Sequence, residues 1–145
     1  MNEKHAYEVN LQWLNDRKGV VSSPILTEQI EVVTPPEFPK GIAGVWSPEH
    51  LFVAAVNSCL MTTFLSIAEN SKIDFISFES NAIGTIEKVE GKWLVSEIVL
   101  KPILTISTDL NPERALRILE MSEKACMISN SIKSAIIFEP QIKTQ

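Results

Sequence analysis

The chain has 145 residues, 45% of them hydrophobic and 21% charged, with 13 Lys and Arg against 18 Asp and Glu. A chain of this length typically buries about 68 to 70% of its unfolded surface, so collagenous, low-complexity and disordered classes are excluded. The net charge of -5 argues against nucleic-acid or anionic-membrane binding as the main task, because both need clustered Lys and Arg. We expect a single domain over residues 1–145.

Nothing in the sequence directs the chain to a secretory route or a membrane. The first 13 residues are polar and alternating and lack an apolar signal region. We also expect no apolar stretch that approaches the roughly 18 residues of a membrane span. The predicted location is the cytoplasm, a reducing compartment in which the two cysteines are free or reactive rather than a structural disulfide.

The first third of the chain has the patterns of short strands. Residues 7–13 alternate between apolar and polar side chains, which predicts a strand. Residues 15–19 supply a polar turn, and residues 20–21 and 28–33 indicate further strands that end before Pro35 and Pro36. Residues 40–46 contain two glycines and are expected to form a loop.

A helix start follows at Ser47, Pro48 and Glu49, which supply a capping hydroxyl, a proline at the first helical position and an acid in the first turn. Trp46 and Leu51 occupy the positions of a hydrophobic staple. Residues 51–68 are apolar around most of the helical wheel. Such a helix is expected to be buried on nearly all sides, at the domain centre or in a subunit interface.

The second half predicts two long strands, a second helix and a last strand. Residues 78–89 and 93–108 form strand patterns that residues 90–92 join as a hairpin. Asn111, Pro112 and Glu113 repeat the helix-start signature, residues 129–130 break that helix, and residues 135–142 indicate a closing strand. The order predicts an α+β domain with helices packed on largely antiparallel sheet.

Four side chains are candidates for chemistry: Cys59, Cys126, Arg17 and Glu49. Each also has an ordinary structural explanation. The cysteines can be small core residues, Arg17 a solvated turn residue and Glu49 a first-turn acid that favours the helix dipole. Apolar surroundings raise the pKa of a thiol, so a reactive Cys59 requires a cation that the fold brings close.

The spacing of Glu49 and Cys59 excludes a shared site within one helix. They are ten residues apart, which is about 15 Å along the helix axis and roughly 80° around it. If both are functional, the site combines two copies of the chain, or Glu49 acts through an intermediary such as an arginine. His5, His50 and the two cysteines lack the spacing of a zinc site, so we expect neither metal nor cofactor.

Residues 47–55, followed by Asn57, Ser58 and Cys59, resemble the N-P-E-x-L-x-x-A-x-x-x-C signature of the OsmC/Ohr family of thiol-dependent hydroperoxide reductases. The segment 125–130 is similar to the family's C-P-x-S segment, and Trp13 with residues 17–19 is similar to the strand and turn that carry its arginine. Two positions depart from the pattern: Ser47 replaces an asparagine, and Met127 replaces the proline after the second cysteine.

The resemblance implies an α+β, OsmC-like fold in which largely antiparallel sheets surround a buried cysteine-bearing helix, with a second helix, in an intertwined homodimer. It implies that Cys59 is the peroxidatic cysteine and Cys126 the resolving one. Arg17 would stabilise the thiolate and the peroxide, with Lys18 as the alternative cation, and Glu49 would orient Arg17.

By the same resemblance, the chain would reduce organic hydroperoxides to alcohols through a sulfenic acid and an intramolecular disulfide, in defence against oxidative stress. A dithiol, either a lipoyl protein or a small thiol, would reduce the disulfide again. One alternative from another class stays open: a non-catalytic OsmC-like dimer that binds a small apolar ligand and in which both cysteines are structural.

Overall fold

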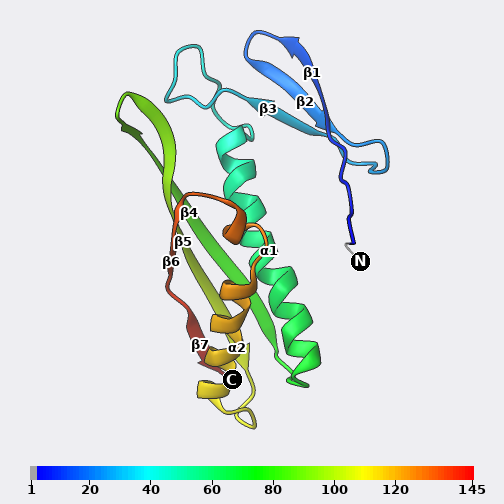
Figure 1. The fold of residues 1–145 in the computed structure, drawn as a ribbon, viewed down its shortest axis with the longest axis vertical. Helices are drawn as coiled ribbons and strands as arrows, with labels where there is room; N and C mark the ends of the chain where they lie inside the picture. The colour runs from blue at the N-terminus through cyan, green and yellow to red at the C-terminus, as the bar shows by residue number, and fades with distance from the viewer. Residues whose placement is uncertain (1–2) are drawn as a thin grey trace. The chain divides into compact units, whose positions relative to one another are not determined.

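The computed structural model describes residues 3–145, which divide into two compact units, the residues up to Leu51 and Phe52–Gln145. Unit 1 contains an antiparallel sheet of three strands in the order β1-β2-β3, drawn in blue to cyan in Figure 1. These strands are β1 (Asn10–Asn15), β2 (Lys18–Ser22) and β3 (Ile30–Val33). The predicted single domain over 1–145 stays a prediction.

The turn between β1 and β2 is tighter than predicted, because only Asp16 and Arg17 separate the strands. Asp16 has a φ of 45°, a left-handed conformation that aspartate tolerates better than most residues. The indole Nε1 of Trp13 donates a hydrogen bond of 3.1 Å to the Asp16 carbonyl and fastens the turn. The predicted strand over 7–13 was wrong at its start, since β1 begins at Asn10.

Unit 1 buries little apolar surface. Val33 and Pro35 are its buried apolar side chains among the residues that the structure describes, whereas Leu11 and Trp13 on β1 are exposed. A small sheet normally needs a covered apolar face to be stable. Unit 1 therefore does not carry a core of its own.

Unit 2 is built around a long hairpin. Its elements are α1 (Pro48–Asn70, whose first turn lies in unit 1), β4 (Ser77–Val89), β5 (Lys92–Ile106), α2 (Pro112–Ala125), the 3-10 turn η1 (Ser129–Ser131), β6 (Ala135–Phe138) and β7 (Gln141–Thr144). The predicted hairpin is confirmed: β4 and β5 are antiparallel and joined by Glu90 and Gly91. Both turn residues have positive φ, as a type I′ turn requires.

The expected closing strand consists of two short strands. Pro140 separates β6 from β7 because it cannot donate a hydrogen bond to the sheet. Both strands run parallel to β5, one after the other, and the N–H of Glu139 donates to the Leu100 carbonyl at 2.9 Å between them. The sheet of unit 2 is therefore mixed.

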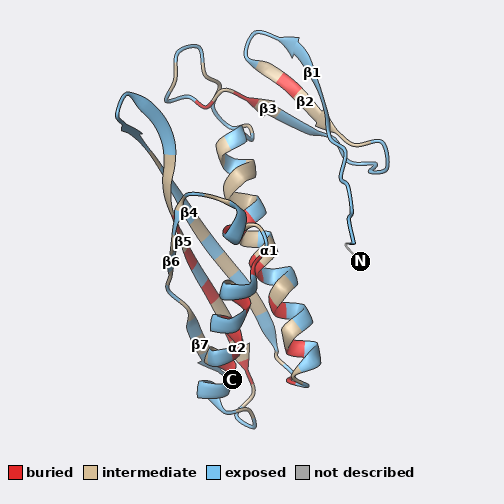
Figure 2. Ribbon diagram, in the orientation of Figure 1, coloured by how far each residue is buried: buried red, intermediate tan, exposed pale blue. Residues whose placement is uncertain are grey.

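Helix α1 is buried along one face only. The buried positions recur every four residues, at Val56, Leu60, Phe64 and Ala68. Figure 2 shows buried residues on this face, on β5 and on α2. Phe64 stacks on Phe78 of β4 with ring centroids 5.0 Å apart. The prediction that this helix is buried on nearly all sides was wrong for a single chain.

Helix α1 is apolar in overall composition, and its exposed residues include Met61 and Leu65 as well as Ser58, Thr62 and Ser66. An 18-residue window of this helix has a mean hydropathy of 1.8, enough for a membrane span by length and composition alone. The expectation that no apolar stretch approaches that length was therefore wrong. The core helix of a globular domain passes the same test, and α1 contributes Val56, Leu60 and Phe64 to the core of unit 2.

Candidate active site

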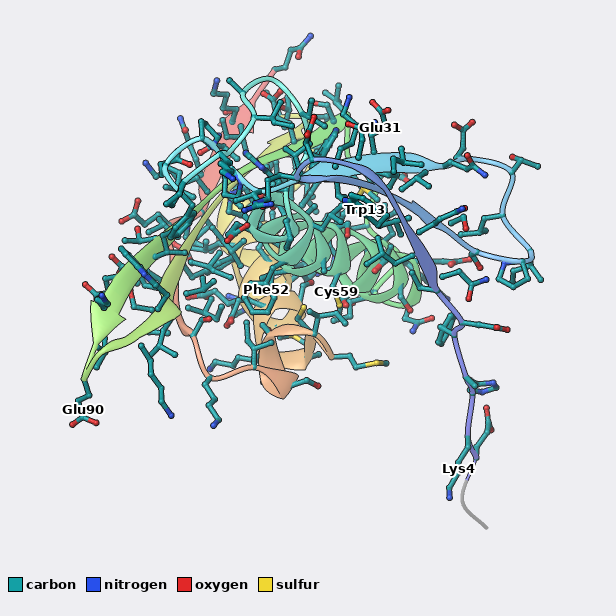
Figure 3. All side chains as sticks on the ribbon, turned by 90° about the horizontal axis from the view of Figure 1, so that it is seen from above. Lys4, Trp13, Glu31, Phe52, Cys59 and Glu90 are labelled. Atoms are coloured by element: carbon teal, nitrogen blue, oxygen red, sulfur yellow. The ribbon has the colours of Figure 1, made fainter. Side chains whose placement is uncertain are left out.

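The two cysteines meet in unit 2. Cys59 lies on α1, on the side of the helix that faces the orange segment after α2 in Figure 3, and its side chain is partly buried. Cys126 is the C-cap of α2 and is 1% exposed. Neither forms a disulfide, and each of the two thiols affects the pKa of the other.

The turn after α2 holds Cys126 in place. The N–H of Cys126 donates to the Glu123 carbonyl at 3.2 Å, and the Cys126 carbonyl accepts from the Asn130 N–H at 3.1 Å and the Ser129 hydroxyl at 3.2 Å. On α1 itself, the hydroxyl of Thr63 lies 3.8 Å from the Cys59 sulfur.

These surroundings shift the pKa values of the two thiols in opposite directions. Burial by itself raises the pKa of Cys59. Four groups stabilise the thiolate and lower the pKa overall: the backbone N–H of Ile128, the Cys126 thiol, the Thr63 hydroxyl and the backbone N–H of Met127. Burial raises the pKa of Cys126, and the neighbouring Cys59 thiolate raises it further, against the opposing hydrogen bonds from Ser129. Cys59 is therefore the thiol that ionises first, while Cys126 keeps its proton to a higher pH.

Arg17 and Glu49 both lie in unit 1, and this unit does not pair them. Arg17 is exposed in the β1–β2 turn, where its carbonyl accepts from the Thr34 N–H at 3.2 Å. Glu49 lies in the first turn of α1, and its Oε1 is buried without a hydrogen-bond partner among residues 3–145. No ion pair joins the two side chains in this part of the chain, whereas Lys18 reaches Glu31 at 4.0 Å. The role of Glu49 in orienting Arg17 stays a prediction.

The start of α1 is capped as predicted by Ser47, with His50 completing the arrangement. The Ser47 hydroxyl oxygen accepts from the His50 N–H at 3.2 Å, and the Ser47 N–H donates to His50 Nδ1 at 3.3 Å. This is a capping box with histidine in the usual place of Glu or Gln. The Trp46 ring meets His50 edge-on, with centroids 5.9 Å apart. In the described chain, no three His, Cys, Asp or Glu side chains cluster as a metal site would require.

Sequence reasoning missed several groups around the sulfurs. Thr63 could have been found, because it lies four residues after Cys59 and hence on the same helical face. Ser129, whose hydroxyl and N–H both act on Cys126, is the serine of the segment already singled out. The amides of Met127 and Ile128 left no signal, since every residue except proline carries a backbone N–H.

Comparisons with known proteins identify the family. The family model for OsmC-like protein matches residues 41–141, and no curated protein matches the chain. Similar solved structures include an OsmC-like protein of unknown function from Vibrio cholerae O1 biovar eltor, at 23% identity and a TM-score of 0.83, with 94% of this chain and 99% of that chain covered.

Two further neighbours carry a functional name. An organic hydroperoxide resistance protein from Elizabethkingia anophelis is 20% identical with a TM-score of 0.79 and full coverage of both chains. The organic hydroperoxide resistance protein of Bacillus subtilis is 18% identical with a TM-score of 0.71, covering 96% of this chain and 98% of that one. These likenesses establish the α+β fold, and with the family match they show that this chain belongs to the OsmC family.

Proposed function

We propose that this protein is a thiol-dependent peroxidase that reduces organic hydroperoxides to alcohols. The observation that carries the proposal is the interacting pair of Cys59 and Cys126, in which one thiol has a lowered pKa and the other a raised pKa. A peroxidatic cysteine must be a thiolate, since the thiolate is the nucleophile. A resolving cysteine that stays protonated does not compete with it for the peroxide.

The reaction balances with these two residues and one external reductant. The Cys59 thiolate attacks the terminal peroxide oxygen, the O–O bond breaks, and the alkoxide leaves and takes up a proton to become an alcohol. Cys59 is then a sulfenic acid, which condenses with the Cys126 thiol to form a disulfide and release water. A dithiol reductant, a lipoyl protein or a small thiol, is oxidised to its own disulfide and restores both cysteines.

Arg17 and Glu49 would complete the site. A guanidinium with several N–H donors suits both the peroxide oxygens and the departing alkoxide. The exposed, unpaired Arg17 and the orphan Oε1 of Glu49 are consistent with an ion pair that forms when a second copy of the chain is present. The lack of a core within unit 1 and the exposed Met61 and Leu65 side chains of α1 likewise favour a homodimer. We place the protein in the cytoplasm, in defence against oxidative stress.

Thiol counting tests the chemistry. Reduced protein treated with one equivalent of cumene hydroperoxide should lose two thiols per chain and form a Cys59–Cys126 disulfide that mass spectrometry detects. Cys59→Ser should abolish consumption of the peroxide. Cys126→Ser should stop at a Cys59 sulfenic acid that a 1,3-diketone traps. Unchanged thiol counts would overturn the proposal and favour the non-catalytic dimer that binds a small apolar ligand.

The cation is tested by a pair of neighbouring substitutions. Arg17→Ala should slow peroxide consumption far more than Lys18→Ala, because Lys18 already faces Glu31 on β3. Removal of one donor to a developing oxyanion typically costs about 10²- to 10³-fold in rate. Equal effects of the two substitutions would contradict the assignment of Arg17.

A further inference from the structure

A groove runs along the exposed face of α2 within unit 2. It has a volume of about 440 Å³ and is lined by Ser71, which follows α1, and by six residues of α2 between Arg114 and Lys124. Binding sites for small molecules typically have volumes of about 300–1,000 Å³. The groove is therefore large enough for a small ligand, and neither cysteine lines it.

The groove is basic although the chain is acidic overall. The net charge of the chain is -5, but Arg114, Arg117 and Lys124 line the groove against a single carboxylate, that of Glu120. The three cations and Met121 follow one another at spacings of three, four and three residues, which places them on one side of the helix. The groove therefore concentrates positive charge, including two of the chain's three arginines, at one place on an acidic protein.

The cations of the groove keep hydrogen-bond donors free. Arg114 Nη2 donates to the Ser71 carbonyl at 2.6 Å, which holds the guanidinium at the groove and occupies one of its five N–H donors. The side chains of Arg117 and Lys124 form no ion pair or hydrogen bond within residues 3–145. A guanidinium with unoccupied N–H groups binds a carboxylate or phosphate through two parallel hydrogen bonds.

Apolar side chains line the same groove. Ile118 is 4% exposed and belongs to the core cluster that contains Phe64 and Leu119. Met121 is 54% exposed, and a flexible thioether side chain of this kind adapts to the shape of an apolar partner. A ligand with an anionic head and an apolar chain would therefore cover exposed apolar surface while its head pairs with the arginines.

We propose that this groove binds an amphiphilic anion, a molecule with one carboxylate or phosphate headgroup and a short apolar chain. The headgroup pairs with Arg114 and Arg117, and the chain covers Ile118 and Met121. Glu120, the one carboxylate that lines the groove, opposes the anion. The inference goes beyond the proposed peroxidase function because it involves neither cysteine. It also differs from the non-catalytic alternative, whose ligand is apolar and needs no charge.

Isothermal titration calorimetry of the full-length protein with decanoate tests the role of charge. Decanoate should bind at one site per chain, and added salt should weaken its binding. Arg117→Gln should bind decanoate about fivefold more weakly, the upper range for a solvent-exposed ion pair. Lys101→Met removes an exposed cation of β5 outside the groove and should bind as the wild type does. Glu120→Gln should bind more tightly. No binding, or equal affinities of Arg117→Gln and Lys101→Met, would overturn the inference.

Matched ligands test the headgroup. Decyltrimethylammonium has the same chain as decanoate and the opposite charge, so it should not bind in the groove. An affinity equal to that of decanoate would show that charge plays no part and would overturn the inference. Decyl phosphate should bind as well, and the tighter of the two anions identifies the headgroup.

Methyl NMR locates the ligand without any substitution. In protein labelled with ¹³C at the methionine methyl groups, decanoate should shift the signal of Met121. Met127 is the internal control, because it is 73% exposed but lies outside the groove. An unmoved Met121 signal, or equal shifts of both signals, would refute the site. Cys59→Ser should show the same Met121 shift as the wild type, so a failed peroxidase assay with normal binding would overturn the function and not the groove.

Discussion

Thr63 offers a sharp test of how the Cys59 thiolate is stabilised, because its neighbour provides a matched control. The Thr63 hydroxyl lies 3.8 Å from Cys59 Sγ. The hydroxyl of Thr62 instead donates to the backbone carbonyl of Cys59 at 3.2 Å and is exposed. Thr63→Val and Thr62→Val make the same exchange of a hydroxyl for a methyl group one position apart on α1, and only the first removes a donor from the sulfur.

The expected magnitude follows from the distance. A hydrogen bond to a charged group contributes about 1.5–3 kcal/mol at good geometry. The sulfur–oxygen separation of 3.8 Å is long, so we take half of the lower bound, about 0.75 kcal/mol. At 1.36 kcal/mol per tenfold change, this lowers the thiolate fraction about three- to fourfold at a pH below the pKa.

The sign of the pH dependence is fixed by the direction of the change. Removal of a donor raises the pKa of Cys59 towards that of an ordinary thiol, so Thr63→Val should be alkylated more slowly below the pKa and at an unchanged or slightly higher rate above it. Thr62→Val should follow the parent throughout. The assay is the iodoacetamide pH profile in a Cys126→Ser background. Superimposable profiles for the two valine variants would refute the reasoning.

Other predictions concern stability, measured by urea unfolding. Gly84→Ala should lower the free energy of unfolding by about 1–3 kcal/mol, because its Cβ would clash with Val53 Cγ2 where α1 approaches β4. Adding Val53→Ala should make the effect of Gly84→Ala smaller, and full additivity would contradict the contact. Asn111→Ala should cost about 1 kcal/mol, since Asn111 Oδ1 accepts from the Glu113 N–H at 2.9 Å at the start of α2. Asn111→Ser should retain most of that stability, and an equal loss would argue against the cap.

Features set by local chemistry could be predicted from the sequence. The hairpin turn at Glu90 and Gly91 has positive φ at both residues. The strand patterns on either side of residues 90–92 predict this turn. The caps at Ser47 and Asn111 are hydrogen bonds within three residues of the helix start. In each case a few neighbouring residues determine the conformation. Such features do not depend on what packs against them.

Features set by distant contacts could not be predicted as well. The alternation of residues 7–13 favours a strand, but pairing with β2 sets the boundary and places β1 at 10–15. The apolar residues around the helical wheel of α1 predict burial but do not indicate which parts of the protein cover each side. In a single chain, only one face of α1 is buried. The likeness of residues 125–130 to a known segment drew attention to Cys126, 67 residues after Cys59. Its interaction with Cys59 depends on tertiary packing that no local pattern encodes.

The groups proposed to take part in the chemistry are divided between the two units. Every group that lowers the pKa of Cys59 belongs to unit 2, namely two backbone amides, the Cys126 thiol and the Thr63 hydroxyl. The charged candidates, Arg17 and Glu49, belong to unit 1 and are unpaired there. The pKa of Cys59 is therefore lowered within unit 2 without a contribution from the arginine. We therefore expect Arg17 to act mainly on the substrate, where its guanidinium would orient the peroxide and stabilise the departing alkoxide.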